Sequence, residues 1–179
     1  MDYQQILDFW FREISAEQWW VKDPEFDALL VRRFSDVHAA AARCELYQWR
    51  RTPHGRLAEV IVLDQFSRNM FRNQPKSFAA DPLALALAQE AVAGGHDQAL
   101  NTVERGLLYM PYMHSESQLV HEEAVRLFEA NGVEQTLEYE WRHKRIIDRF
   151  GRYPHRNAIL GRESSEEEIE FLKQPGSSF

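Results

Sequence analysis

Apolar residues recur at the helical period from one end of the chain to the other, and this pattern restricts the fold more than any other feature. In the segment from Pro24, the apolar positions fall three or four residues apart on one helical face: Phe26, Leu30, Phe34, Val37, Ala41 and Cys44. No stretch has the strict two-residue alternation of a half-buried β-strand. The sequence therefore predicts an all-α fold of stacked antiparallel helical hairpins.

Capping and turn residues set the bounds of the predicted helices. Asp23 and Pro24 suit the N-cap and first position of the helix that ends at Cys44. The next helix begins near Pro53 and is apolar on nearly every face through Phe71, which predicts a central position. Further helices are predicted from Asp81 to Gly94, from Thr102 to Met110 before Pro111, from Ser115 (with Gln118 as a capping box) to Asn131, from Val133 to Phe150 and from Ser164 to Lys173.

Length and composition predict one cytoplasmic domain. A chain of 179 residues with five Trp and eleven Phe can bury a core, so we expect a single domain over residues 1–179 that ends in a short tail, residues 174–179. No apolar run is long enough to span a membrane, and the N-terminal residues lack a signal-peptide pattern. The net charge of −7 argues against general nucleic-acid binding. Cys44 lies on an apolar stripe and is predicted to be a buried, unreactive thiol.

A first polar segment interrupts the apolar face of the central helix. Asp64 and Arg68 continue the face one turn after the other, four residues apart, so they can form an ion pair. One interpretation is a buried structural pair with satisfied hydrogen bonds. The other is that Asp64, Gln65, Arg68 and Asn69 line a pocket for a polar ligand.

A second polar segment contains two histidines. His114 and His121 are seven residues apart, which is two helical turns, and His121 falls on an apolar stripe. Two histidines on one face could ligate a metal together with Glu116, Glu122 or Glu123, but the spacing is not a recognised metal signature. Glu140 and His143 have the Glu-x-x-His spacing of di-iron bundles without a second such pair. We therefore predict no metal and no cofactor.

A third polar segment is basic. Between Arg142 and Arg162 the chain has seven Arg or Lys residues and one acidic residue, and a run of Glu follows from Glu163. Guanidinium groups bind phosphate or carboxylate with paired hydrogen bonds, so the segment could form an anion site. It could equally be a solvated face offset by the Glu run. The candidate ligand-binding residues are Arg149, Arg152, His155, Arg156 and Asn157.

These motifs resemble the bacterial domain-of-unknown-function 924 family over essentially the whole chain. The matching stretches are ILDFWF, LDQFSRNMFR, MPYMHSES, HKRIIDRFGRYPHRN and FLKQPGSSF. The resemblance implies an all-helical architecture grouped with the tetratricopeptide-like superhelices, and no settled biochemical function. The helical pair from Ser115 to Phe150 has about the thirty-five-residue length of a tetratricopeptide repeat, although other pairs do not repeat its pattern.

Three functions remain open from the sequence. The first is a binding module whose polar, net-cationic pocket accepts a small anion or an acidic peptide end. The second is a hydrolase or lyase that uses His114 or His121 with Asp64 or Glu116 as acid and base, with or without a metal. The third is a purely structural polar core. They differ in whether the three polar segments meet at one place.

Overall fold

The computed structural model describes residues 1–178, and every regular element in that range is helical. This confirms the predicted all-α class. Phe179, the last residue of the predicted tail, lies outside the described residues. The α-helices are α1 (Tyr3–Asp8), α2 (Pro24–Ala42), α3 (Pro53–Ile61), α4 (Ser67–Met70), α5 (Asp81–Ala93), α6 (Thr102–Met113), α7 (Gln118–Asn131), α8 (Glu134–Phe150), α9 (Asn157–Leu160) and α10 (Glu166–Leu172).

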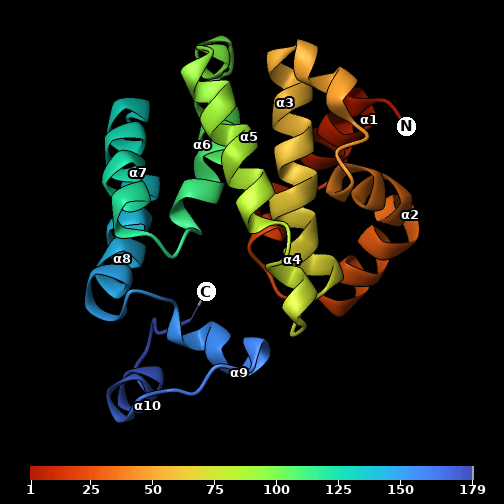
Figure 1. Cartoon of the computed structure of the whole chain (residues 1–179). Coiled ribbons are helices and arrows are strands. Elements are labelled where there is room, and N and C mark those ends of the chain that lie inside the picture. The colour runs from red at the N-terminus through yellow and green to blue at the C-terminus, as the bar shows by residue number, and fades with distance from the viewer. Residues whose placement is uncertain (179) are drawn as a thin grey trace.

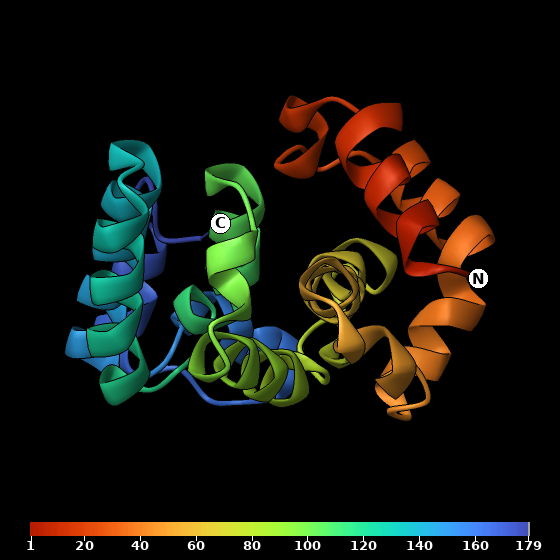
Figure 2. The same cartoon turned by 90° about the horizontal axis from the view of Figure 1, so that it is seen from above.

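Consecutive helices pack against each other as hairpins. Contacts join α3 to α5, α5 to α6, α6 to α7 and α7 to α8, while α1 packs on α3. Seen from above, the helices follow a curved path from α1 and α2 at one end to α7 and α8 at the other (Figure 2). This curvature fits the tetratricopeptide-like arrangement that the resemblance implied.

The main core runs along this path, and aromatic side chains dominate its N-terminal end. Phe9, Trp10, Phe34 and Phe66 are all at most 1% exposed. The rings of Phe9 and Phe34 have centroids 4.8 Å apart, and those of Phe34 and Phe66 5.0 Å apart. Aromatic pairs in this range add stability beyond the area they bury. The aromatic N-terminal segment is therefore a core anchor.

The central helix contains a π-helical turn where the first polar segment lies. Helices α3 and α4 are joined by Val62–Phe66, which is π-helical and fully buried, and which includes Asp64 and Gln65. π-helical turns within α-helices are rare and are frequently found at functional sites. The extra residue in the turn changes the direction of the side chains that follow, so it contributes to aiming the polar groups at the end of the helix.

Three local predictions are wrong. Helix α6 continues through Pro111 to Met113, because the residues around the proline are buried and their packing outweighs one lost helical hydrogen bond. Helix α7 is capped by Ser117, whose side chain accepts from Val120 N–H, rather than by Ser115. Cys44 is exposed, because α2 ends at Ala42 and the chain turns away with a φ of 60° at Cys44.

The residues after α8 form a separate layer, called here the C-terminal segment (residues 151–178). It starts at Gly151, whose φ of 68° ends α8 in the left-handed conformation. Figure 1 shows α9 and α10 lying across the lower end of the hairpins formed by α6, α7 and α8. Apolar side chains of the C-terminal segment and of the end of α8 form a small cluster apart from the main core: Ile146, Ile147, Phe150, Tyr153 and Phe171. Within residues 1–178 no helix has the length and apolar character needed to cross a membrane.

Candidate functional site

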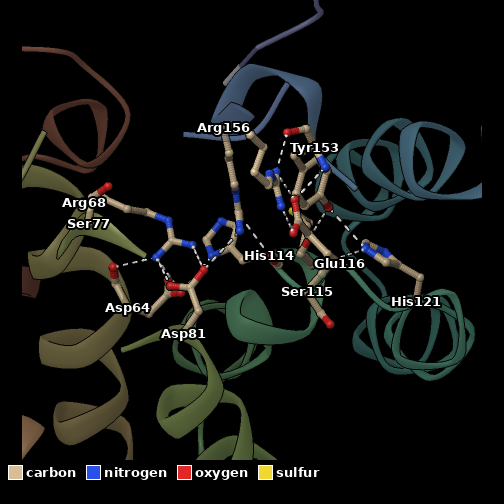
Figure 3. A network of polar contacts seen from close by, with 12 residues as sticks. Asp64, Arg68, Ser77, Asp81, His114, Ser115, Glu116, His121, Tyr153 and Arg156 are labelled. Atoms are coloured by element: carbon tan, nitrogen blue, oxygen red, sulfur yellow. Dashed lines mark hydrogen bonds and ion pairs between the residues drawn. The ribbon is translucent and has the colours of Figure 1, made fainter. Parts of the chain in front are cut away.

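The three polar segments meet where the C-terminal segment covers the ends of α3–α4 and α6. Figure 3 shows their side chains pointing toward one another from these separate elements. We call this group the polar centre, and its members are Asp64, Arg68, Asp81, His114, Glu116, His121, Tyr153, Arg156 and Arg162. Convergence of the segments is what distinguishes a site from a scatter of buried charges.

Asp64 is the acceptor at the base of the polar centre, with its side chain 1% exposed. One carboxylate oxygen forms an ion pair with Arg68 Nη1 at 3.0 Å and lies 2.8 Å from His114 Nδ1. The other accepts from Gln65 Nε2 at 2.6 Å. Burial alone would raise the pKa of Asp64, but the charge of Arg68 and the contact with His114 hold it well below its usual range. Asp64 is therefore an ionised, fully hydrogen-bonded carboxylate.

His114 is held in one tautomer by this carboxylate. An ionised carboxylate can only accept, so the hydrogen of the imidazole lies on Nδ1 and the lone pair on Nε2. The side chain is 14% exposed, and no residue in the described part of the chain forms a hydrogen bond with Nε2. Burial and the charge of Arg68 lower the pKa of His114 in spite of the attraction of Asp64. The ring is therefore neutral near pH 7.

Asp81 contacts two arginines, Arg68 and Arg156, which are far apart in the sequence. Arg68 donates to its two oxygens at 3.0 and 3.1 Å, whereas Arg156 reaches one of them at 3.3 Å. Arg156 also donates from Nη2 to the carbonyl of His114 at 3.0 Å. The pKa of Arg68 is raised, because Asp64 and Asp81 outweigh the effect of its burial. The pKa of Arg156 is lowered, by burial first and then by repulsion from Arg68.

Glu116 ties the C-terminal segment to the start of α7. Its carboxylate accepts from the backbone N–H of Tyr153 at 2.7 Å and from both terminal nitrogens of Arg162 at 2.7 and 2.9 Å. Burial would raise the pKa of Glu116, but these donors lower it below its ordinary value. The Glu116 carboxylate therefore binds the C-terminal segment to the start of α7.

His121 and Glu140 form a second pair that is completely buried. Glu140 Oε1 lies 2.6 Å from His121 Nδ1, and both side chains are 0% exposed. His121 Nε2 lies 2.9 Å from the carbonyl of Ser115, so it must carry a hydrogen, and Tyr153 donates its hydroxyl hydrogen to the carbonyl of Met113 at 2.5 Å. Burial raises the pKa of Glu140. This pair supports the walls of the site rather than facing a ligand.

Histidines surround the ring of Tyr153, which is 0% exposed. The ring centroids of His143 and His155 lie 5.8 and 5.7 Å from that of Tyr153. Burial lowers the pKa of His143 to about 3. Burial, together with the charge of Arg156, lowers the pKa of His155 to about 3 as well. These rings are uncharged at neutral pH.

Several residues predicted for the site lie elsewhere. Asn69 donates to Asp27 at 2.9 Å on the side of α2. Arg149 and Arg152 turn toward α10, where they bind Glu167 and Glu168, so part of the basic run is offset by the Glu run.

Other predicted residues lie at the edge of the polar centre or inside it. Asn157 is buried at the edge, where it accepts from Arg162 Nε at 2.9 Å and donates toward Ser164. His155 borders the polar centre through its ring contact with Tyr153, and Gln65 borders it through its hydrogen bond to Asp64. The other predicted residues are members of the polar centre: Asp64, Arg68, His114, Glu116, His121 and Arg156.

Sequence reasoning missed three members of the polar centre. Asp81 was interpreted only as the start of α5, and its position before Pro82 gave no hint that its side chain would bind Arg68 and Arg156. Tyr153 and Arg162 were counted within the basic run without a role. The only available signal was the density of basic residues between Arg142 and Arg162.

The charges of the polar centre balance. Asp64, Asp81 and Glu116 face Arg68, Arg156 and Arg162, three acidic groups against three basic ones, so the predicted cationic surplus is absent from the formal charges. Within residues 1–178, no three His, Cys, Asp or Glu side chains are placed to hold a metal ion.

Two surface grooves lie away from the polar centre. One of about 560 Å³ lies along α7, and its lining includes Leu119 and Arg126. Another of about 280 Å³ lies between α1 and α6, and its lining includes Tyr3 and Glu104. Neither is lined by a member of the polar centre, so these grooves do not give access to it.

Comparison with known proteins places the chain among proteins of unknown function. Residues 6–176 match the model of the family described as "Bacterial protein of unknown function (DUF924)". A solved structure of a protein of unknown function from Agrobacterium tumefaciens is 40% identical, with a TM-score of 0.91 and with 96% of each chain covered. None of the curated proteins matches the chain.

Proposed function

The chain belongs to the DUF924 family of bacterial proteins, and from the geometry of its polar centre we propose that it binds a small anion, or the acidic end of a peptide, beside Arg156. One observation carries the proposal. Arg156 is 6% exposed, yet its Nε–H has no hydrogen-bond partner within the described residues. Buried polar groups are nearly always satisfied, so an unsatisfied guanidinium edge calls for an explanation.

Arg156 has weaker contacts with acidic side chains than its neighbour Arg68 has. Arg156 shares Asp81 with Arg68 and has the longer contact, 3.3 Å against 3.0 Å. The lowered pKa of Arg156 reflects its burial and the nearby Arg68. An additional negative charge would offset both effects. The formal balance of the polar centre therefore hides a local shortage of negative charge at this one guanidinium.

Aromatic rings limit the direction from which a ligand can approach. The guanidinium carbon of Arg156 lies 4.5 Å from the ring centroid of Phe78 and 4.7 Å from that of Tyr153. Cation–π contacts of this kind stabilise the charge but accept no in-plane N–H hydrogen bond. The remaining edge of the guanidinium suits carboxylate or phosphate oxygens, which bind arginine in its plane.

Access to Arg156 would be through the C-terminal segment. That segment holds to the hairpins mainly by polar contacts, such as those of Glu116 with Tyr153 and Arg162. Its apolar cluster is separate from the main core, so local opening should cost less than global unfolding. Gly151 and Gly161 have positive φ angles, a backbone conformation that glycine adopts without steric cost.

Thermal unfolding with anions tests the proposal. Inorganic phosphate, sulfate, malate and succinate are each titrated against the wild-type protein and against Arg156→Gln. A ligand at 100 times its Kd adds about 2.7 kcal/mol to the free energy of unfolding, which corresponds to a rise in Tm of roughly 5 to 10 °C for a chain of this size. We expect at least one anion to raise the Tm of the wild type and not that of the variant.

Two further variants separate binding from general charge effects. Arg149→Gln removes an arginine whose side chain is 48% exposed, so it should keep the full response. Arg156→Lys keeps the charge without the Nε–H edge and should keep only part of it. If no anion stabilises the wild type more than Arg156→Gln, the polar centre is a structural core and the proposal fails.

A second function, acid–base catalysis, is favoured by the contact between Asp64 and His114. A carboxylate that fixes Nδ1–H and leaves Nε2 available is the arrangement by which enzymes orient a general base. The corresponding test incubates the protein with a bacterial metabolite mixture and compares turnover with that of His114→Gln. A hydrolase or lyase would consume a compound only with His114 present, and no difference between the two proteins would refute this function.

A further inference from the structure

We infer that the anion bound beside Arg156 must carry its own hydrogen-bond donor next to its charge, because His114 presents a ring nitrogen that can only accept. The inference rests on the proposed anion site and names its ligand class. Ligands of this class are hydroxycarboxylates, the carboxyl end of a peptide with its amide N–H, and hydrogen phosphate. Simple carboxylates and sulfate do not belong to it.

The acceptor character of His114 follows from its neighbours. Asp64 is ionised beside Arg68 and can only accept hydrogen bonds, so the imidazole hydrogen that faces its carboxylate must lie on Nδ1 of His114. Burial and the charge of Arg68 keep the ring neutral. A neutral imidazole with its hydrogen on Nδ1 has only a lone pair at Nε2.

Arg156 and His114 are adjacent, so one small ligand can contact both. Arg156 Nη2 donates to the backbone carbonyl of His114 at 3.0 Å. Figure 3 shows Arg156 and His114 in one network of polar contacts, together with Asp64 and Asp81. The site therefore combines an unsatisfied donor, Arg156 Nε–H, with an acceptor, His114 Nε2.

Ligands that lack a donor are penalised at such a site. A sulfate or simple carboxylate would direct lone pairs at the lone pair of His114 Nε2 and would also leave that nitrogen without water. Sites built around a hydrogen bond reject analogues that lack one of its partners, because a buried polar group is then left unpaired. A ligand with an O–H or N–H next to the charge satisfies both residues.

Two matched pairs of anions test the inference by isothermal titration calorimetry at pH 7. Phosphate and sulfate have nearly the same shape, but only phosphate retains a hydrogen at this pH. Malate and succinate have the same chain length and differ by one hydroxyl. We expect phosphate to bind at least about tenfold more tightly than sulfate, and malate at least about tenfold more tightly than succinate.

His114→Gln identifies the residue responsible. A glutamine amide can donate as well as accept, so the variant should bind sulfate and succinate nearly as well as phosphate and malate. Arg156→Gln should lose all four. Equal binding of the paired anions by the wild type, with dependence on Arg156, would overturn the inference and leave the proposed anion site standing. Absence of binding by all four would overturn both.

Discussion

The buried histidines near Tyr153 should make the stability of the protein fall steeply on mild acidification. His143 is 5% exposed, and its Nδ1 donates to the carbonyl of Tyr139 at 2.8 Å. The pKa values of His143 and His155 are lowered to about 3, mainly by burial. In the unfolded chain a histidine has a pKa near 6.5. Each ring must therefore stay uncharged in the folded protein over a range in which the unfolded chain binds a proton.

The size of the effect follows from the difference in pKa. A group whose folded pKa is depressed loses its contribution as the pH falls from the unfolded pKa toward the folded one, which for these histidines is the window from about 6.5 to 3. Each histidine then costs about 1.4 kcal/mol per pH unit. Between pH 7.5 and pH 5 the free energy of unfolding should fall by about 2 kcal/mol for each ring, or about 4 kcal/mol for both.

Carboxylates do not reproduce this dependence. Groups with lowered pKa values, such as Glu116 and Glu168, are ionised in both states above pH 5 and lose their contribution only at lower pH. Glu140 has the opposite sign, because burial raises its pKa and the folded protein gains stability as the pH falls through that value. A comparison of variants removes the contribution of Glu140 from the result.

Urea unfolding at pH 7.5, 6 and 5 measures the effect in the wild type, His143→Asn and His155→Asn. Asparagine keeps an N–H donor for Tyr139 but binds no proton, so each variant should lose about 2 kcal/mol of the fall in the free energy of unfolding between pH 7.5 and pH 5. His54→Asn, at a histidine whose side chain is 44% exposed, is the matched surface control. The reasoning is refuted if His143→Asn retains the full slope between pH 7.5 and 5.

Three other predictions concern single residues. Asp64→Asn should lower the free energy of unfolding by about 3 to 5 kcal/mol in urea titrations, because it leaves the buried charge of Arg68 with one partner fewer; a loss under 1 kcal/mol would contradict burial of that pair. Glu116→Gln should speed hydrogen exchange of the Tyr153 amide more than that of amides in α3, and equal change in both would exclude local opening. Cys44 should react with a thiol reagent in the folded protein, and a protected thiol would contradict its exposure. Cys44→Gly should raise the free energy of unfolding by up to about 1 kcal/mol, because the φ of 60° at this position is strained for any residue with a side chain.

Periodicity and capping residues predicted the longer helices because most of them have one face toward the core, whereas the short helices α1 and α9 were not predicted. Helix α2 has a single apolar stripe and lies at the edge of the bundle. Helix α3 is apolar on nearly every face and lies in the middle of the bundle. The errors fall where packing outweighs local preference. Pro111 lies inside α6 among buried neighbours, and Cys44 follows a stripe that continues past the point where the chain turns. Neither could be known without the neighbouring helices.

The candidate site was predictable only in part. Asp64, Arg68 and His121 stood on apolar faces, and burial of polar groups there follows from helix geometry. The partners could not be predicted, because Arg156 and Asp81 are 75 residues apart in the chain and meet only through the packing of the C-terminal segment. For the same reason Arg149 and Arg152 could not be distinguished from Arg156 by sequence, although they face α10 instead.

The distribution of hydrogen bonds divides the polar centre into two parts with different roles. Around Asp64 every carboxylate oxygen has a donor, and such a satisfied network fixes one arrangement of the helices without needing a ligand. At Arg156 and His114 the network ends with one N–H and one ring nitrogen that no described residue occupies. A purely structural core would gain by satisfying the buried N–H of Arg156 or by replacing it with an apolar group. The satisfied part therefore accounts for the shape of the centre, and the unsatisfied edge is where a ligand would be bound.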